Sequence, residues 1–126
     1  MPYSQNWGTP FHIKKRFEDY FDPCPFPKPA WDGLKIEWKN KNFVNPPYNE
    51  IVKWAQKCCE EFKKGRECVL LIPSRTDTRY FHDFIIPYAK IEFIKGRLRF
   101  VDLNGSSGGN GKAPFASIFC HYLPSH

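Results

Sequence analysis

The sequence predicts an α/β fold, because short apolar runs of strand length alternate with stretches whose apolar residues recur at helical spacing. The clearest helix carries such residues at steps of three and four: Ile51, Trp54, Ala55, Cys58, Cys59 and Phe62. The clearest strand is 68–72, a continuous apolar run typical of a strand that is covered on both faces. At 126 residues the chain is expected to form a single domain, 1–126, with a modest core.

The N-terminal third is expected to contain one helix and several short or irregular pieces. The helix starts at Thr9-Pro10, with the proline in its first turn, and carries apolar residues up to Tyr20. Phe21-Asp22 follows as a short extended segment. Residues 23–31 are expected to be irregular because four alternating prolines exclude a helix. Leu34–Trp38 is expected to be a short strand.

The rest of the chain is expected to alternate between strands and helices. Phe43-Val44 forms a buried strand that Asn45-Pro46 terminates, Asn49 caps the helix that begins near 51, and Gly65 closes it. The remaining expected elements are a helical stretch at about 77–86 and strands at 90–94, 98–101 and 117–123. This order indicates a trimmed Rossmann-like sheet, mostly parallel with an antiparallel C-terminal strand, and with helices on both faces.

Composition favours a polyanionic partner and a reducing environment. The formal net charge is +6, and 17% of the residues are aromatic, a class that fills cores and also stacks on bases. The five cysteines form no Cys-x-x-Cys pair and the histidines are dispersed, so no metal site is expected. The sequence contains neither a signal peptide nor an apolar stretch of membrane length, so a cytoplasmic location without membrane association is expected.

The segment Asn45-Pro46-Pro47-Tyr48 follows directly on the expected strand at 43–44. The amide oxygen of Asn45 and the carbonyl of Pro46 can each accept one hydrogen of an NH2 group, and Tyr48 can stack on a planar ring. Proline donates no N–H, so both linkages are rigid. The segment is typical of a clamp for an amino group that is to be alkylated. A turn that merely ends a strand is the alternative interpretation.

Together with further segments, this tetrapeptide gives the chain a family resemblance. The chain resembles the small adenine-N6 DNA methyltransferases of phages and prophages. The matching segments occur in that family's order and cover nearly the whole chain: Trp7-Gly8-Thr9-Pro10, Phe21-Asp22-Pro23-Cys24, Asp32-Gly33-Leu34, 43–48, 71–78, 96–100 and Ala113-Pro114-Phe115.

The resemblance implies transfer of a methyl group from S-adenosylmethionine to the N6 amino group of adenine in DNA. The target base would be flipped out of the duplex into the clamp of Asn45, Pro46, Pro47 and Tyr48. The same resemblance implies a role in restriction-modification or phage biology, and the cytoplasm of a bacterial host if the protein is phage-encoded. So small a protein facing a duplex could work as a homodimer.

The residues that the resemblance implies for the cofactor are Trp7, Thr9, Pro10, Asp22, Pro23 and Asp32. All of these except Trp7 have a plainer interpretation. Thr9-Pro10 could be an N-cap with a first-turn proline, Asp22 could open the turn before Pro23, and Asp32 could belong to an Asp-Gly turn. Because ligands sit at the carboxyl ends of strands in such sheets, Asp22, Asn45 and Ser74 are expected on one edge. The chain departs from the family in lacking a Gly-x-Gly loop after its first strand.

Basic residues in the second half are candidates for DNA contacts, with plain surface charge as the alternative. They are Arg75, Arg79, Arg97, Arg99 and Lys112. The glycine-rich segment 105–112 does not match a phosphate-binding loop, since Ser106 and Ala113 occupy positions where that loop needs Gly and Ser or Thr. It is expected to be a flexible hairpin loop that could grip DNA beside the site.

Two other functions remain open from the sequence. The same tetrapeptide serves methyltransferases that alkylate a glutamine side chain in proteins, because a primary amide poses the same geometric problem. A non-catalytic nucleic-acid-binding remnant is the second alternative, and the absence of the glycine loop favours it.

Overall fold

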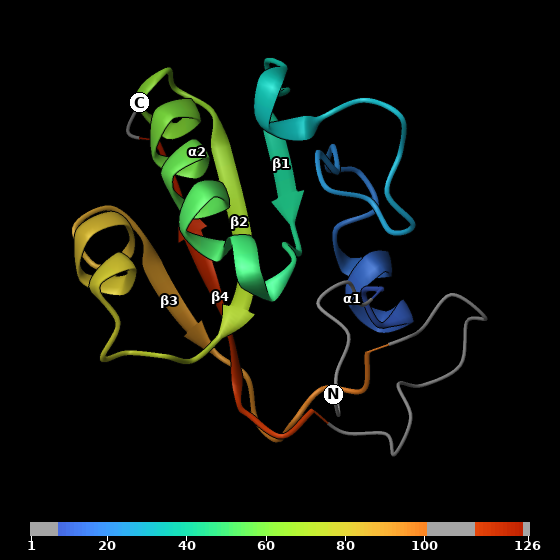
Figure 1. Cartoon of the computed structure of the whole chain (residues 1–126), viewed down its shortest axis with the longest axis vertical. Coiled ribbons are helices and arrows are strands. Elements are labelled where there is room, and N and C mark those ends of the chain that lie inside the picture. The colour runs from blue at the N-terminus through green and yellow to red at the C-terminus, as the bar shows by residue number, and fades with distance from the viewer. Residues whose placement is uncertain (1–7, 101–112, 125–126) are drawn as a thin grey trace.

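The computed structural model describes residues 8–100 and 113–124. Its strands are β1 (Lys41–Val44), β2 (Glu67–Pro73), β3 (Lys90–Phe93) and β4 (Ser117–Tyr122), and they form a sheet in the order β1-β2-β4-β3 (Figure 1). β1 is parallel to β2, whereas β4 is antiparallel to both of its neighbours. The α/β class and the antiparallel C-terminal strand are confirmed. The expected mostly parallel sheet is wrong for the described strands, because β4 inserts between β2 and β3 and leaves one parallel pair.

A further backbone segment extends the sheet beyond β1. Phe21 forms an isolated parallel bridge with Asn42. The N–H of Phe21 donates to the Lys41 carbonyl at 2.9 Å, and the N–H of Phe43 donates to the Phe21 carbonyl at 2.8 Å. The extended segment expected at Phe21 is therefore confirmed, and it runs in the same direction as β1.

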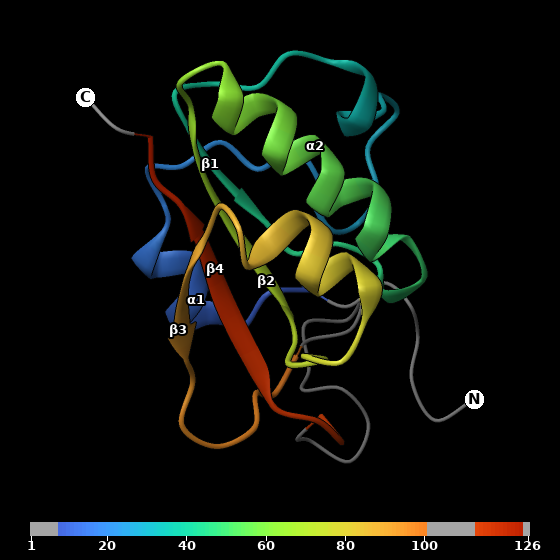
Figure 2. The ribbon, with the colours of Figure 1, turned by 90° about the vertical axis from the view of Figure 1, so that its left-hand side faces the viewer.

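Helices lie on both faces of this sheet (Figure 2). The helix α2 (Ile51–Lys63) and the π-helical turn η3 (Phe81–Ile85) cover one face, and α1 (Phe11–Arg16) lies against the other. Side chains alternate along a strand, so β2 directs Leu70 to the α2 face and Leu71 to the α1 face. The sheet is thus buried on both sides, as the apolar run at 68–72 predicts.

The predicted helices are present with different ends. α2 begins at Ile51 and is followed by Gly65, whose φ of 93° needs the conformational freedom of glycine. The expected cap at Asn49 is wrong: Tyr48–Glu50 form a 3-10 turn (η2), and Glu50 takes the N-cap position without a side-chain capping bond. α1 ends at Arg16, well before Tyr20. The helix expected at 77–86 is also shorter than predicted, with its described π-helical part at Phe81–Ile85.

Two predicted strands are wrong. At 34–38 the chain forms a 3-10 turn, η1 (Gly33–Lys35), and folds back so that the indole N–H of Trp38 donates to the Gly33 carbonyl at 2.8 Å. Residues 98–100 are not paired in the sheet. There the Leu98 carbonyl accepts from the N–H of Ala113 at 2.8 Å.

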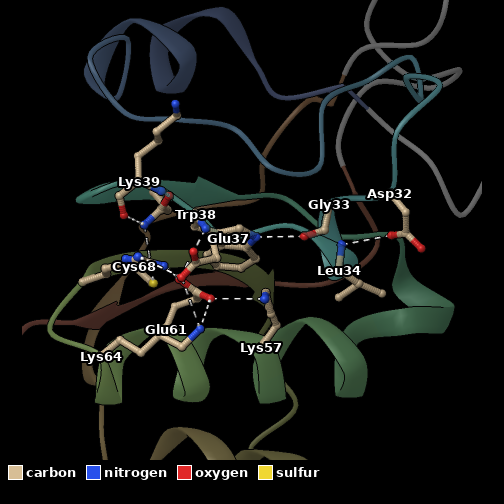
Figure 3. Close-up of polar contacts among 12 residues, drawn as sticks. Asp32, Gly33, Leu34, Glu37, Trp38, Lys39, Lys57, Glu61, Lys64 and Cys68 are labelled. Atoms are coloured by element: carbon tan, nitrogen blue, oxygen red, sulfur yellow. Dashed lines mark hydrogen bonds and ion pairs between the residues drawn. The ribbon is translucent and has the colours of Figure 1, made fainter.

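A buried carboxylate fixes the segment before β1 to α2 (Figure 3). Glu61 is fully buried and forms ion pairs with Lys57 at 3.1 Å, with Lys64 at 3.4 Å and with Arg66. Its Oε1 also accepts from the Trp38 N–H at 3.4 Å. Burial raises the pKa of Glu61, but the hydrogen bonds from Arg66 and Lys57 outweigh it and hold the pKa below its ordinary value. An ionised Glu61 therefore anchors the chain as it enters β1.

Candidate active site

The parallel segments of the sheet end at one edge, the lower one in Figure 1. Phe21, β1 and β2 run in the same direction, so the residues that follow them, Asp22, Asn45 and Ser74, lie along this edge. Ser74 is held there by its N–H, which donates to the Ala116 carbonyl at 2.8 Å. The three positions share the edge that the sequence predicts for them.

Asn45 is joined to the start of α1. Its Nδ2 donates to Thr9 Oγ1 at 3.1 Å, across 36 positions of the sequence. Pro10 holds the N-cap position of α1, which has no side-chain cap bond, so Thr9 is not the N-cap and Pro10 is not in the first turn. That plainer interpretation of Thr9-Pro10 is wrong, because the Thr9 hydroxyl is directed to the clamp residue instead of the helix.

The ring of Tyr48 is set by two aromatic neighbours. Phe115 meets it edge-to-face with the ring centroids 5.2 Å apart, and Phe100 does so at 6.5 Å. These phenylalanines flank the two sides of the 101–112 segment in the sequence. Sequence reasoning included both in matching segments but gave them no role. No local signal could have assigned them this role, because both lie far from Tyr48 in the sequence and meet it only in the folded chain.

The prolines of the clamp shape the turn into α2. Pro46 is buried and Pro47 half-buried. Pro47 occupies the N-cap position of η2, and its carbonyl accepts from the N–H of Glu50 at 3.0 Å. Asn45 and Tyr48 are consequently separated by a rigid corner between β1 and α2.

Asp22 lies half-buried next to the same edge. Its Oδ1 accepts from the N–H of Cys24 at 2.9 Å, which is the turn that the plainer interpretation predicts. Burial raises the pKa of Asp22 to about 6, although the Cys24 N–H and the charge of Lys14 act in the opposite direction. A carboxyl group with this pKa is stabilised as an anion when a cation binds beside it.

A pocket of 330 Å³ adjoins the clamp on the side of α2. Its wall contains Pro23 and Asp32, which the sequence predicts for the cofactor, and Pro47 from the clamp. Trp31 and Glu50 also line it; sequence reasoning missed both, because nothing in the local pattern shows that the 23–34 segment folds against the start of α2. Pro23 and Asp32 thus meet the clamp in one pocket, whose wall does not include Asp22 or Thr9.

Asp32 also has a local structural role. Its Oδ1 accepts from the Leu34 N–H at 2.9 Å and caps η1 (Figure 3). The Asp-Gly turn is therefore present, and it leaves the exposed carboxylate at the pocket wall.

The arginines predicted for DNA are exposed. Arg75 and Arg79 follow β2, and Arg97 and Arg99 follow β3. Within 8–100 and 113–124, none of these four forms an ion pair; the cations that do are Arg16, Lys57, Lys64, Arg66 and His121. Trp7 and Lys112 lie outside the described residues, as does the glycine-rich segment 105–112, so the expected hairpin loop stays a prediction.

The family model for DNA N-6-adenine-methyltransferase (Dam) matches residues 24–122. The chain belongs to this family. The match includes the clamp, the four arginines and the pocket wall apart from Pro23, and it makes the chain a DNA adenine methyltransferase by family. No curated protein and no solved structure matches the chain.

In the described part of this Dam-family chain, none of the helices is long and apolar enough to cross a membrane. The same residues contain no group of three or more His, Cys, Asp or Glu side chains placed to hold a metal ion.

Proposed function

We propose that this protein transfers the methyl group of S-adenosylmethionine to the N6 amino group of adenine in DNA, with the base held by Asn45, Pro46, Pro47 and Tyr48. The observation that carries the proposal is the position of this tetrapeptide. It directly follows β1, at the edge shared by Asp22, and Pro47 lines the 330 Å³ pocket. Together with the match to the Dam family, this supports a site where cofactor and base meet.

The clamp residues can make the adenine amino nitrogen more reactive. The lone pair of the adenine amino group is delocalised into the ring, so the nitrogen is a poor nucleophile. When Asn45 Oδ1 and the Pro46 carbonyl accept its two hydrogens, they favour a pyramidal nitrogen and stabilise the positive charge that develops on it. Holding that nitrogen in line with the methyl group of a bound cofactor would account for much of the expected rate gain.

The residues around the pocket fit the proposed cofactor. Trp31 offers an aromatic surface for the adenine ring, and the carboxylate of Asp32 offers acceptors for hydroxyl groups. Asp22, which is not part of the pocket wall, would pair with the positively charged end of the cofactor. When bound, the cofactor supplies an electrophilic methyl group. The protein's part is to orient that group towards Asn45 and to exclude water.

The target base must leave the duplex to reach this clamp, at a cost of a few kcal/mol. Stacking on Tyr48 would offset about 1–3 kcal/mol of it. The exposed Arg75, Arg79, Arg97 and Arg99 would hold the flanking phosphates. Their charge acts on any DNA sequence, so it supplies affinity and not specificity.

The test is a methyl-transfer assay with labelled S-adenosylmethionine and two acceptors, duplex DNA and a glutamine-containing protein. Label on DNA supports the proposal, and label on protein alone would replace it by the glutamine-amide reaction. Failure to bind the cofactor while DNA is bound would indicate a non-catalytic remnant. Asn40→Ala is a matched control for Asn45→Ala, because Asn40 is exposed and precedes the opposite end of β1.

A further inference from the structure

We propose that Thr9 is a positioning residue that sets the orientation of the Asn45 side-chain amide; this inference rests on the proposed function. The observation is the hydrogen bond from Asn45 Nδ2 to Thr9 Oγ1, at 3.1 Å. It joins Thr9, which precedes the N-cap residue of α1, to the residue after β1, and it acts on the amide group that the proposed reaction uses.

The orientation matters because a primary amide has two unlike arms. One arm is an NH2 group, which only donates, and the other is a carbonyl oxygen, which only accepts. A substrate amino group presents hydrogens, so it can be held only by the oxygen. If the amide turned over, Nδ2 would face the substrate nitrogen, donor against donor. In the structure the Thr9 hydroxyl accepts from Nδ2 and holds this arm next to the start of α1, so Oδ1 lies on the other side of the amide.

The Thr9 hydroxyl is available for this task because α1 does not use it. Pro10 occupies the N-cap position, and its carbonyl accepts from the N–H groups of Ile13 and Lys14 at 3.1 and 3.0 Å. The helix therefore starts on backbone bonds alone. A threonine before such a helix has no capping function that would explain its hydroxyl.

α1 is also held firmly enough to serve as a reference for the amide. Ile13 and Phe17 are buried against the sheet, and the ring of Phe17 stacks on Phe43 with the centroids 4.7 Å apart. At the far end, Arg16 donates to both carboxylate oxygens of Glu92 on β3, at 2.7 and 2.8 Å. Thr9 thus sits on an element that is fixed to β1 and to the opposite edge strand.

The experiment compares Thr9→Val, which removes the hydroxyl at nearly constant shape, with Thr9→Ser, which keeps it. For Thr9→Val we expect kcat to fall about tenfold, the equivalent of ~1.4 kcal/mol in the barrier, while the Kd for S-adenosylmethionine changes less than twofold. Thr9→Ser should retain most of kcat. A weaker Kd with unchanged kcat in Thr9→Val would overturn the inference and make Thr9 a cofactor ligand only. Equal activity of all three proteins would overturn it as well.

Combining Thr9→Val with Asn45→Asp separates the effect on amide orientation from any other effect of the Thr9 substitution. In Asn45→Asp the two side-chain oxygens are equivalent, so no orientation has to be selected. Thr9→Val should therefore cost much less in that background than with Asn45, and an equal cost in both would contradict the inference.

A measurement that needs no turnover keeps this inference distinct from the proposed function. The 15N–1H signals of the Asn45 side-chain amide should shift or broaden in Thr9→Val and stay in place in Thr9→Ser. If they do so while the wild-type protein methylates no DNA, the proposed function fails and the positioning role stands. If the signals are the same in all three proteins, the positioning role fails.

Discussion

Gly33 lies against the backbone carbonyl of Pro23, so closely that a Cβ atom at position 33 would come within 1.7 Å of the Pro23 oxygen. The same Cβ would lie 2.9 Å from the indole of Trp54 on α2. At position 33 the segment that follows Asp22 packs against α2, the helix that follows the clamp. Gly33, Pro23 and Trp54 all line the 330 Å³ pocket, so this contact sets the pocket's shape.

Gly33→Ala is expected to destabilise the fold and to weaken cofactor binding together. Backbone atoms cannot yield as a flexible side chain does, so we expect a loss of about 2–3 kcal/mol in the free energy of unfolding, measured by urea denaturation. Gly96→Ala is the matched control: its φ of 78° strains an alanine, but a Cβ there meets nothing within 4 Å. It should lose about 1 kcal/mol and bind S-adenosylmethionine normally. Normal affinity in Gly33→Ala would show that the contact does not shape the cofactor site.

Cofactor affinity should rise with pH through about 6, because Asp22 must ionise to pair with a cation. The folded-state pKa of Asp22 is raised above its ordinary value of 3.8 to about 6. Asp22 therefore contributes to the stability of the fold at pH values below its pKa in the unfolded chain. This contribution is lost as the pH rises through the folded-state pKa of about 6. Ionising the partly buried Asp22 carboxyl costs free energy, and a cation bound beside it offsets this cost. The Kd for S-adenosylmethionine should therefore fall as the pH increases from 5 to 7 and then level off.

Calorimetric titration of S-adenosylmethionine across that range checks this expectation. Asp22→Asn should flatten the profile, whereas Asp19→Asn, at an exposed carboxyl three positions earlier, should retain it. A profile that is flat in the wild-type protein would mean that Asp22 does not pair with the cofactor's charge.

Tyr48→Ala should weaken binding to DNA whose target base is already unpaired by about 1–3 kcal/mol, since it removes the stacking surface. Tyr48→Phe keeps the ring and should bind nearly as the wild type does. Phe115→Ala should lie between the two, because it removes the side chain that meets the Tyr48 ring edge-to-face at 5.2 Å. Fluorescence titration with 2-aminopurine at the target position measures all three. Undiminished affinity of Tyr48→Ala would exclude stacking at this residue.

Replacing Arg97 and Arg99 together by glutamine should reduce the salt dependence of DNA binding. Each lost phosphate contact is expected to lower the slope of log K against log salt by about 0.9. The matched control is Lys35→Gln with Lys63→Gln, two exposed cations at the ends of η1 and α2. An equal change of slope in both double variants would mean that only net charge matters and that the arginines have no special position.

Much of this site could be predicted from local sequence patterns. The strand at Phe43-Val44, the helix after it and the apolar run at 68–72 each have a clear periodicity, and the parallel pairing of β1 with β2 then places Asn45 and Ser74 on one edge. For these elements the sequence alone was sufficient, because the burial of one or both faces determines the spacing of their apolar residues.

The parts that failed depend on contacts between distant segments. The 34–38 segment has the composition of a strand, but the bond from Trp38 to Gly33 and the buried Glu61 hold it in another shape. Nothing local reveals that β4 inserts between β2 and β3, or that the Thr9 hydroxyl reaches Asn45. These features arise from tertiary packing, which overrides local propensity.

The most direct test of the central claim is to digest duplex DNA after incubation with S-adenosylmethionine and protein, and to quantify N6-methyldeoxyadenosine by mass spectrometry. The wild-type protein and Asn40→Ala should produce it, while Asn45→Ala should produce none although it still binds the cofactor. Methylated adenine formed at the wild-type rate by Asn45→Ala would contradict the assignment of the clamp. Its absence with the wild-type protein, when cofactor and DNA are both bound, would contradict the proposed reaction itself.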